Sequence, residues 1–360
     1  MASPVQFRSE RKAARLHDPR HAFALRMVES EVRWDPLTGD SGRICHFAFN
    51  SAPPADLQTL VEISKETCPF CGDKVNTVTP TFAGDEIPEG RLRHGDAVLF
   101  PNLFPYDDVS AVAVISRSHF VPMDDVPEQA IVDGLGVARD FFERCAPGPD
   151  PRWSIVNWNY MPPSGGSQVH PHLQVVHTAN PGNAILRLQS AERDWRARHR
   201  RPYAAMLIEA EHAAGDRWIG ETDGVVFLAP YVPAGLLGDV TAIFADTATL
   251  ADLDDTRIEA FARGLRRLLR GFSAKGLWSF NLVLFPAPVG ADASTHWLMA
   301  RIVPRLYINP ALHVTDVAYT PLLLEERFAM TWPEDTAAHL RPFLRGEAAG
   351  GSAGPRPAAA

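Results

Sequence analysis

The stretch Gly165-Gly166-Ser167-Gln168-Val169-His170-Pro171-His172-Leu173-Gln174-Val175-Val176 is the part of the chain from which the rest can be interpreted. Its second half alternates polar and apolar residues, so a strand would place His170, His172 and Gln174 on one face and the intervening apolar side chains on the other. Its two glycines and one serine are residue types that let backbone N–H groups approach a phosphate. Pro171 cannot donate to a sheet ladder, which predicts an edge strand or the start of a strand.

Two histidines on one face of a strand have a specific chemistry. A neutral imidazole is abundant at pH 7, can attack phosphorus, and forms a phosphoramidate that transfers its group onward. The pattern therefore favours nucleotidyl transfer through a covalent histidine intermediate. Two histidines in this arrangement can also be metal ligands or polar residues at a strand end, and the motif alone does not decide between these readings.

Length, composition and charge exclude some classes of protein. The chain has 360 residues, 46% of them hydrophobic, which is enough for two or three core-sized units. Its formal net charge is -8 and it has no long Lys/Arg run, which argues against a nucleic-acid-binding surface. The four cysteines and an N-terminus without the apolar core of a signal peptide predict a reduced, cytoplasmic protein. No apolar run is long enough to span a bilayer.

A second motif, Cys68-Pro69-Phe70-Cys71-Gly72, lies in a loop-like region. Such a knuckle, with proline inside it and glycine after it, lets two thiolates converge on one Zn²⁺. A redox role is weaker, because no strand–loop–helix pattern surrounds the pair. Two further ligands are needed, and His94, His119 and His170 are the candidates.

The second part of the chain repeats the first. Residues 98–101, 110–114 and 153–157, followed by His170, are echoed by residues 225–228, 240–244 and 278–281, followed by His296. The corresponding residues lie about 125 positions apart, which is the size of a domain-sized duplication. The second copy has lost the central chemistry, because His296 is followed by Trp-Leu-Met-Ala-Arg. We therefore expect one half to carry the chemistry and the other to support it.

Several separated segments together resemble galactose-1-phosphate uridylyltransferase, a branch of the histidine-triad (HIT) superfamily that is built from two such half-domains. The matching segments follow the family order along the chain: residues 35–39, 68–71, 100–105 and 116–119, then Asn159 with Ser167, and 170–174. The resemblance implies an α+β fold of two tandem HIT-like half-domains, each an antiparallel sheet with packed helices. We expect an N-terminal arm over 1–25, a catalytic half with the zinc knuckle over 26–215, a second, degenerate half over 216–345, and a disordered tail over 346–360.

The resemblance also assigns roles. It implies that His172 is the nucleophile, assisted by Gln174 and Ser167. It implies one structural Zn²⁺ held by Cys68, Cys71, His119 and His170. The residues that it implies for nucleotide binding are Asn102, Asn159, Gly165, Gly166, Ser167 and Gln174. A metal on His170 would also restrain the strand that carries His172, two residues further along.

Departures from the family narrow the prediction. The positions of a second metal site hold Phe285, Ala300 and Ile302, so we expect no second metal. The sugar-reading Gly-Tyr-Glu is replaced by residues 318–320 (Ala-Tyr-Thr), and a later glutamine by Glu326, so sugar specificity should be altered.

The sequence thus predicts a nucleotidyltransferase that moves a nucleoside monophosphate, UMP first of all, from a nucleotide-sugar-like donor to a phosphate acceptor. A dinucleoside-polyphosphate or nucleotide-sugar phosphorylase that transfers adenylyl groups is the alternative, because residues 166–168 and 172–174 also resemble that branch. A non-catalytic nucleotide-binding homologue is a further alternative. Partners are expected to be small molecules, with a homodimer suggested by the resemblance, and neither nucleic acid nor membrane.

Overall fold

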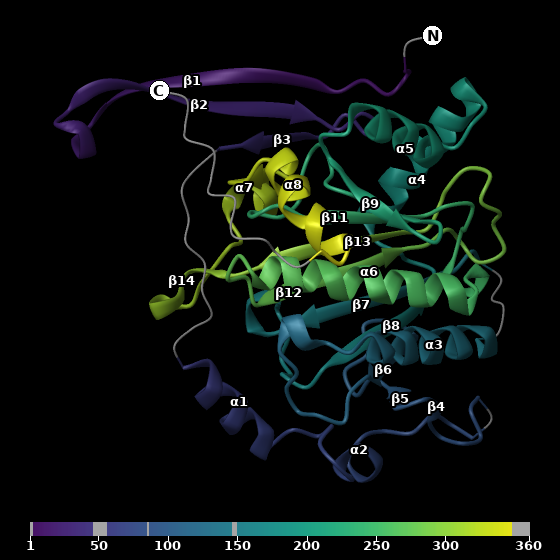
Figure 1. Cartoon of the computed structure of the whole chain (residues 1–360). Helices are drawn as coiled ribbons and strands as arrows, with labels where there is room; N and C mark the ends of the chain where they lie inside the picture. Colours follow the sequence, from purple (N-terminus) through teal and green to yellow (C-terminus); the bar gives the residue numbers. More distant parts are fainter. Residues whose placement is uncertain (1–2, 46–55, 85, 146–149, 348–360) are drawn as a thin grey trace.

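The computed structural model describes residues 3–45, 56–84, 86–145 and 150–347, and Figure 1 shows that they contain both helices and strands. Its strands are β1 (Arg8–Asp18), β2 (Ala24–Trp34), β3 (Ser41–Ile44), β4 (Leu92–His94), β5 (Ala97–Pro101), β6 (Val109–Val114), β7 (Trp153–Tyr160), β8 (His172–Thr178), β9 (Trp218–Thr222), β10 (Val225–Leu228), β11 (Val240–Phe244), β12 (Ser279–Phe285), β13 (Met299–Arg305), β14 (Tyr307–Asn309), β15 (Val314–Thr315) and β16 (Arg327–Ala329). Its helices are α1 (Leu57–Glu66), α2 (Lys74–Thr77), α3 (Glu128–Arg144), α4 (Asn183–His199), α5 (Tyr203–Ala214), α6 (Asp255–Ser273), α7 (Tyr319–Leu323) and α8 (Pro333–Leu344).

One ten-stranded antiparallel sheet organises the molecule, in the order β4-β5-β6-β8-β7-β12-β13-β11-β10-β9. The second five strands repeat the topology of the first five in mirrored order, and the two halves join where β7 pairs with β12. The predicted α+β class with two antiparallel halves is therefore confirmed. The prediction gave each half an antiparallel sheet of its own, and in the structure the two half-sheets join into one.

Of the two positions predicted for Pro171, an edge strand and the start of a strand, the structure has the second. β8 lies inside the sheet, hydrogen-bonded to β6 on one side and to β7 on the other. Pro171 fits because it immediately precedes the strand, where its missing N–H interrupts no ladder, and its carbonyl accepts from the N–H of Ile115.

One face of the sheet is covered by α3 and α6, which lie side by side along it (Figure 1). On α3, Ile131, Leu135 and Ala138 recur at helical spacing and are buried, so this stripe packs on the sheet. Leu173 and Val175 of β8 point into the same core. The alternation predicted for the central motif is therefore present, and it leaves His172 and Gln174 on the opposite face.

The opposite face differs between the two halves. In the second half it is covered by Leu188 of α4 and Ala204 of α5, which pack on Val226, Ile243 and Met299. In the first half the central strands carry polar side chains on this face and a small apolar group beside them. The uncovered polar part of the sheet is where a ligand can reach the strands.

A second, four-stranded sheet has the order β1-β2-β3-β16. β1 and β2 form a long hairpin that runs over the body (Figure 1), and β1 is exposed along almost its whole length. β1 takes up much of the segment expected to be an arm. Residues 348–360 of the expected tail lie outside the described residues. Within the described part of the chain, no helix is both long and apolar enough to cross a membrane.

Candidate functional site

The knuckle and two histidines converge on one point. His170 Nδ1 lies 3.6 Å from Cys68 Sγ and 3.5 Å from Cys71 Sγ, and His119 Nδ1 lies 3.3 Å from Cys71 Sγ. All four ligand atoms lie within 4.8 Å of one another. In a tetrahedral site with ordinary Zn–S and Zn–N bonds, a sulfur and a nitrogen ligand are about 3.6 Å apart. The four side chains therefore have the spacing needed to hold one metal ion.

The surroundings of the cluster favour the metal-binding form of each imidazole. His170 Nε2 lies 2.7 Å from the carbonyl oxygen of Ser116, so this nitrogen carries the proton and Nδ1 keeps its lone pair. His119 Nε2 lies 3.0 Å from Ser64 Oγ, which leaves Nδ1 facing the thiols. Burial lowers the pKa of His170 to about 4, which keeps the ring neutral at pH 7. Two neutral imidazoles and two cysteines are a donor set that suits zinc.

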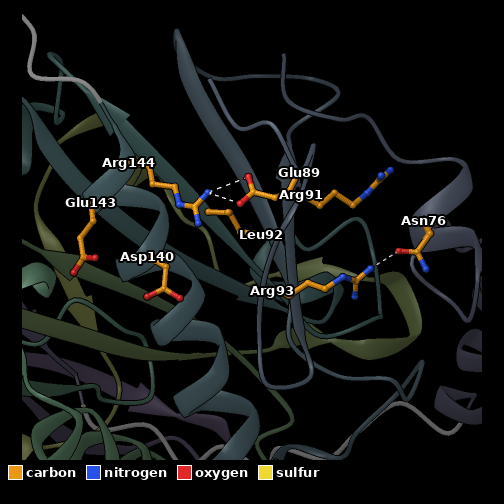
Figure 2. Close-up of a pocket in the computed structure, with 8 residues that line it drawn as sticks. All are labelled: Asn76, Glu89, Arg91, Leu92, Arg93, Asp140, Glu143 and Arg144. Carbon is orange, nitrogen blue, oxygen red and sulfur yellow. Dashed lines mark hydrogen bonds and ion pairs between the residues drawn. The ribbon is translucent and has the colours of Figure 1, made fainter. Parts of the chain in front are cut away.

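His94, the competing ligand, lies elsewhere. Its Nδ1 is 2.9 Å from Asp140 Oδ2 on α3. Asp140 also lines the hollow of about 610 Å³ shown in Figure 2, between β4 and α3. Two of its arginines have partners within the hollow: Arg144 pairs with Glu89, and Arg93 donates to Asn76. None of the predicted site residues lines this hollow, so it is separate from the candidate site.

His172 begins β8 and has a defined tautomer. Its Nδ1 lies 2.8 Å from the carbonyl oxygen of His170, which can only accept, so Nδ1 is protonated and Nε2 carries the lone pair. Burial lowers the pKa of the His172 side chain, which also favours the neutral ring. Nε2 has no hydrogen-bond partner among the described residues, and the His172 residue is 7% exposed. A nucleophilic nitrogen at this position is therefore available.

Phe70 links the knuckle to His172. The ring of Phe70 lies 5.4 Å from that of His172 and 6.0 Å from that of His170, centroid to centroid. It also packs on Phe100 of β5. The residue between the two cysteines thus fixes the plane of the candidate nucleophile, a role that the sequence motif did not reveal.

Gln174 and Asn157 lie beside His172 on the same face. The register of the sheet pairs Asn157 of β7 directly with Gln174 of β8, which places both side chains on one side of the sheet. Gln174 Nε2 donates to the hydroxyl of Tyr106, 3.2 Å away. Asn157 and Tyr106 were not predicted as site residues. The alternation along β7 could have revealed Asn157, whereas Tyr106 reaches the site only through the loop that follows β5.

The glycine loop starts where β7 ends. Asn159 lies on the same face as Asn157, and its side-chain Oδ1 accepts from Asn281 Nδ2 at 2.7 Å. A Cβ on Gly166 would lie only 2.7 Å from the carbonyl oxygen of Asn159, so glycine is required there. Gly165 has φ +83°, a conformation that favours glycine. Tight turning at these two positions brings the loop back toward β8.

Ser167 and Asn102 have less defined roles. The Ser167 side chain is exposed, and its hydroxyl has no hydrogen-bond partner among the described residues. Asn102 follows β5, and its Oδ1 accepts from the N–H of Phe104, which stabilises its own loop. Glu326, at the position of the family glutamine, accepts from Ser41 Oγ at 3.1 Å and from Arg43 Nε at 2.8 Å. Its carboxylate is thus already engaged in an ion pair.

The positions at which the resembled family often carries a second metal have other surroundings here. Ala300 and Ile302 of β13 are buried in the main core. The carbonyl oxygen of Phe285 lies 2.8 Å from His296 Nε2, and the other nitrogen of His296 lies 2.6 Å from Glu192 Oε2. At the place where the first half has its histidine motif, the second half therefore has a buried histidine–glutamate pair.

Comparisons with known proteins agree with this architecture. No protein-family model matches the chain. A protein of Archaeoglobus fulgidus, described as uncharacterized, is 28% identical over 314 residues, which cover 86% of this chain and 91% of that protein.

Among solved structures, a GalT-like protein from Arabidopsis thaliana has a TM-score of 0.65 at 18% identity and covers 87% of this chain and 98% of its own. An ADP-glucose phosphorylase from the same plant, solved with bound ADP-glucose, has a TM-score of 0.65 at 17% identity, with 87% and 98% covered. A uridylyltransferase has a TM-score of 0.64 at 19% identity, with 88% and 98% covered. The chain therefore shares the fold of this GalT-like protein, this ADP-glucose phosphorylase and this uridylyltransferase.

Proposed function

We propose that the protein is a nucleotidyltransferase in which His172 carries the transferred nucleotide. The observation that supports this most directly is the state of the His172 ring: Nδ1 is fixed on the carbonyl of His170, and the unprotonated Nε2 has no partner among the described residues. A nucleophile of this kind needs no separate base, because the attacking nitrogen already has its lone pair.

The reaction has two displacements at one phosphorus atom. In the first, Nε2 of His172 attacks the α-phosphorus of a nucleoside diphosphate sugar, the bond to the bridging oxygen breaks, and a sugar 1-phosphate leaves. In the second, an oxygen of the phosphate acceptor attacks the same phosphorus and the N–P bond breaks, which regenerates the neutral ring. Negative charge develops on the non-bridging oxygens in both steps, and the amides of Gln174 and Asn159 and the hydroxyl of Ser167 are the donors that would stabilise it.

The metal has a supporting role in this proposal. We assign the site of Cys68, Cys71, His119 and His170 to Zn²⁺, because its donor set and spacing fit a closed tetrahedral site. All four positions belong to the protein, so when bound the ion supplies rigidity and leaves no open position for substrate. Bound there, the ion would restrain His170, whose carbonyl oxygen fixes the His172 ring, and Phe70, which lies between the two cysteines and contacts that ring.

UMP is the first candidate for the transferred nucleotide, and AMP is the second. The similarity in fold to an ADP-glucose phosphorylase equals that to the GalT-like protein, which supports the adenylyl alternative. The altered residues Ala318, Thr320 and Glu326 support a leaving group other than galactose 1-phosphate.

The test is to trap the intermediate. The metal-loaded protein is incubated separately with UDP-glucose, ADP-glucose and diadenosine tetraphosphate, each labelled in the α-phosphate, then quenched in alkali and mapped by mass spectrometry. We expect an acid-labile nucleotide on His172, which His172→Ala abolishes, and ping-pong kinetics. The donor that gives the fastest adduct identifies the nucleobase. Tight nucleotide binding that survives His172→Ala, with no adduct in the parent protein, would instead identify a non-catalytic binding protein.

A further inference from the structure

Asn281, in the degenerate second half, contacts two parts of the candidate phosphate site. It lies on β12 directly opposite Asn159 of β7, across the seam between the halves. Its Nδ2 donates to Asn159 Oδ1 at 2.7 Å and to the carbonyl oxygen of Ser164 at 2.9 Å. Ser164 immediately precedes the glycine loop. One amide group of the second half thus holds both a predicted phosphate ligand and the entry to the loop.

The direction of these bonds follows from a third contact. Asn281 Oδ1 lies 2.6 Å from Nη1 of Arg305 on β13. A guanidinium can donate but cannot accept, so the oxygen of the Asn281 amide must face Arg305 and its NH₂ must face the first half. It follows that Asn159 accepts with Oδ1 and that its own NH₂ is left for another partner. The usual ambiguity between the two ends of an amide is thereby resolved at both residues.

Arg305 is in turn held in place. Its Nε lies 2.9 Å from Asp316 Oδ1 and 2.8 Å from Asp316 Oδ2. The Asp316 side chain is only 3% exposed and that of Arg305 is 19% exposed, so water competes little with this ion pair. A paired and largely buried guanidinium offers its remaining N–H groups in a fixed direction. The relay from Asp316 through Arg305 to Asn281 therefore has one consistent polarity.

We propose that Asn281 is a positioning residue for nucleotidyl transfer, held by Arg305 and Asp316, and that it keeps the NH₂ donor of Asn159 directed at the phosphate. The inference rests on the function proposed above and adds to it, since it gives the second half an active part. If the Asn159 amide were turned the other way, its oxygen would face the phosphate. Two negatively polarised groups repel each other, whereas the NH₂ group attracts the phosphate. The relay sets that choice from the opposite side of the domain seam.

The decisive variant is Asn281→Asp. It keeps the shape of the side chain and can still accept from Arg305, but it cannot donate, so Asn159 must turn its NH₂ toward the new carboxylate. Asn76→Asp is the matched control, because Asn76 Oδ1 also accepts from an arginine, Arg93, at 2.6 Å, in the separate hollow of Figure 2. Arg305→Lys keeps a donor for Asn281 Oδ1. Arg305→Leu removes that donor, so the side-chain amide of Asn281 can rotate and exchange the positions of its oxygen and nitrogen.

Two measurements are made on each metal-loaded variant: the rate of adduct formation from UDP-glucose and ADP-glucose, and calorimetric affinities for UMP, AMP and the corresponding nucleosides. We expect Asn281→Asp to slow the adduct about 100-fold or more, as loss of a transition-state donor does. Affinity for the monophosphates should fall about tenfold while affinity for the nucleosides stays unchanged, since the lost contact is to phosphate. Arg305→Lys should keep most of the parental rate, and Arg305→Leu should lose it in part.

The outcomes separate this inference from the proposed function. Parental adduct rates and monophosphate affinities in a folded Asn281→Asp variant would overturn the inference and leave the proposed function standing. If that variant does not fold, the same decision falls to the difference between Arg305→Lys and Arg305→Leu. A parent protein that binds nucleotide without forming an adduct overturns the proposed function, and the inference is then judged on affinity alone. A parent protein that binds no nucleotide overturns both.

Discussion

Replacing Gly166 by alanine should misplace the phosphate loop by a distance that the structure gives directly. The new Cβ would lie 2.7 Å from the carbonyl oxygen of Asn159 and 3.2 Å from that of Met161. Ordinary contacts begin at 3.4 Å, so the loop must withdraw by about 0.7 Å, which is 3.4 minus 2.7. The neighbouring atoms are backbone atoms of β7 and of the residue after it, which cannot rotate away as a side chain would.

Two effects of different size follow. Overpacking of this kind typically lowers the free energy of unfolding by about 1–3 kcal/mol. Displacement of a positioning group by about 1 Å can slow a reaction on the order of 100-fold, so we expect the adduct rate to fall between about 10-fold and 100-fold. The measurements are urea unfolding and the rate of labelling of His172 by the preferred nucleotide sugar.

Gly182→Ala is the control for a general loss of stability. Gly182 has φ +90° and ψ 155°, a backbone region that is essentially restricted to glycine, and open space around its missing Cβ, so alanine there costs backbone strain of about 1–3 kcal/mol without a clash. The two variants should therefore lose similar stability, and only Gly166→Ala should lose activity. A folded Gly166→Ala protein with the parental labelling rate, or equal losses of activity in both variants, would show that the loop does not position phosphate.

Three further predictions concern the metal site and buried charges. Chelation, or Cys68→Ser, should lower both the melting temperature and the adduct rate, and metal analysis of the untreated protein should find about one zinc per chain; an unchanged melting temperature without metal would contradict a structural role. His296→Ala should cost about 3–5 kcal/mol in urea unfolding, because Glu192 is fully buried and would lose its partner, and the double variant with Glu192→Leu should recover part of this. Burial raises the pKa of Asp239 from 3.8 to about 6. The folded chain therefore keeps that proton to higher pH than the unfolded chain, and the unfolding free energy should fall by roughly 3 kcal/mol between about pH 4 and pH 7, a decline that Asp239→Asn should remove.

The contact between His296 and Glu192 shows how the second half differs from the first, in which the corresponding histidine belongs to the candidate metal site. Burial opposes a charged ring at His296, but the hydrogen bond and charge of Glu192 outweigh it and raise the pKa of His296. Both nitrogens of the His296 ring lie near oxygen atoms, which favours its charged form, whereas burial of His172 favours the neutral ring. His296, which corresponds to His170 in the repeat, thus pairs with a buried glutamate, whereas the candidate nucleophile His172 belongs to the first half.

The sequence by itself determined what depends on local patterns. The alternation around His172 placed Leu173 in the core and Gln174 on the open face, since strand side chains alternate whatever the neighbouring strands are. The Cys68–Cys71 spacing predicted a pair of converging ligands, because a tight knuckle can bring two sulfurs together without help from the rest of the fold.

Only the tertiary structure decided the contacts that join distant segments. It selected His119 over His94 as the fourth member of the cluster, placed β8 inside the sheet, and joined the two halves at β7 and β12. The relay from Asp316 to Asn159 also depends on that junction. Asn159 and Asn281 lie more than a hundred residues apart in the sequence. No local periodicity indicates which strand of one half will pair with which strand of the other. The pairing of β7 with β12 therefore brings together side chains that the sequence pattern of each half could indicate only separately.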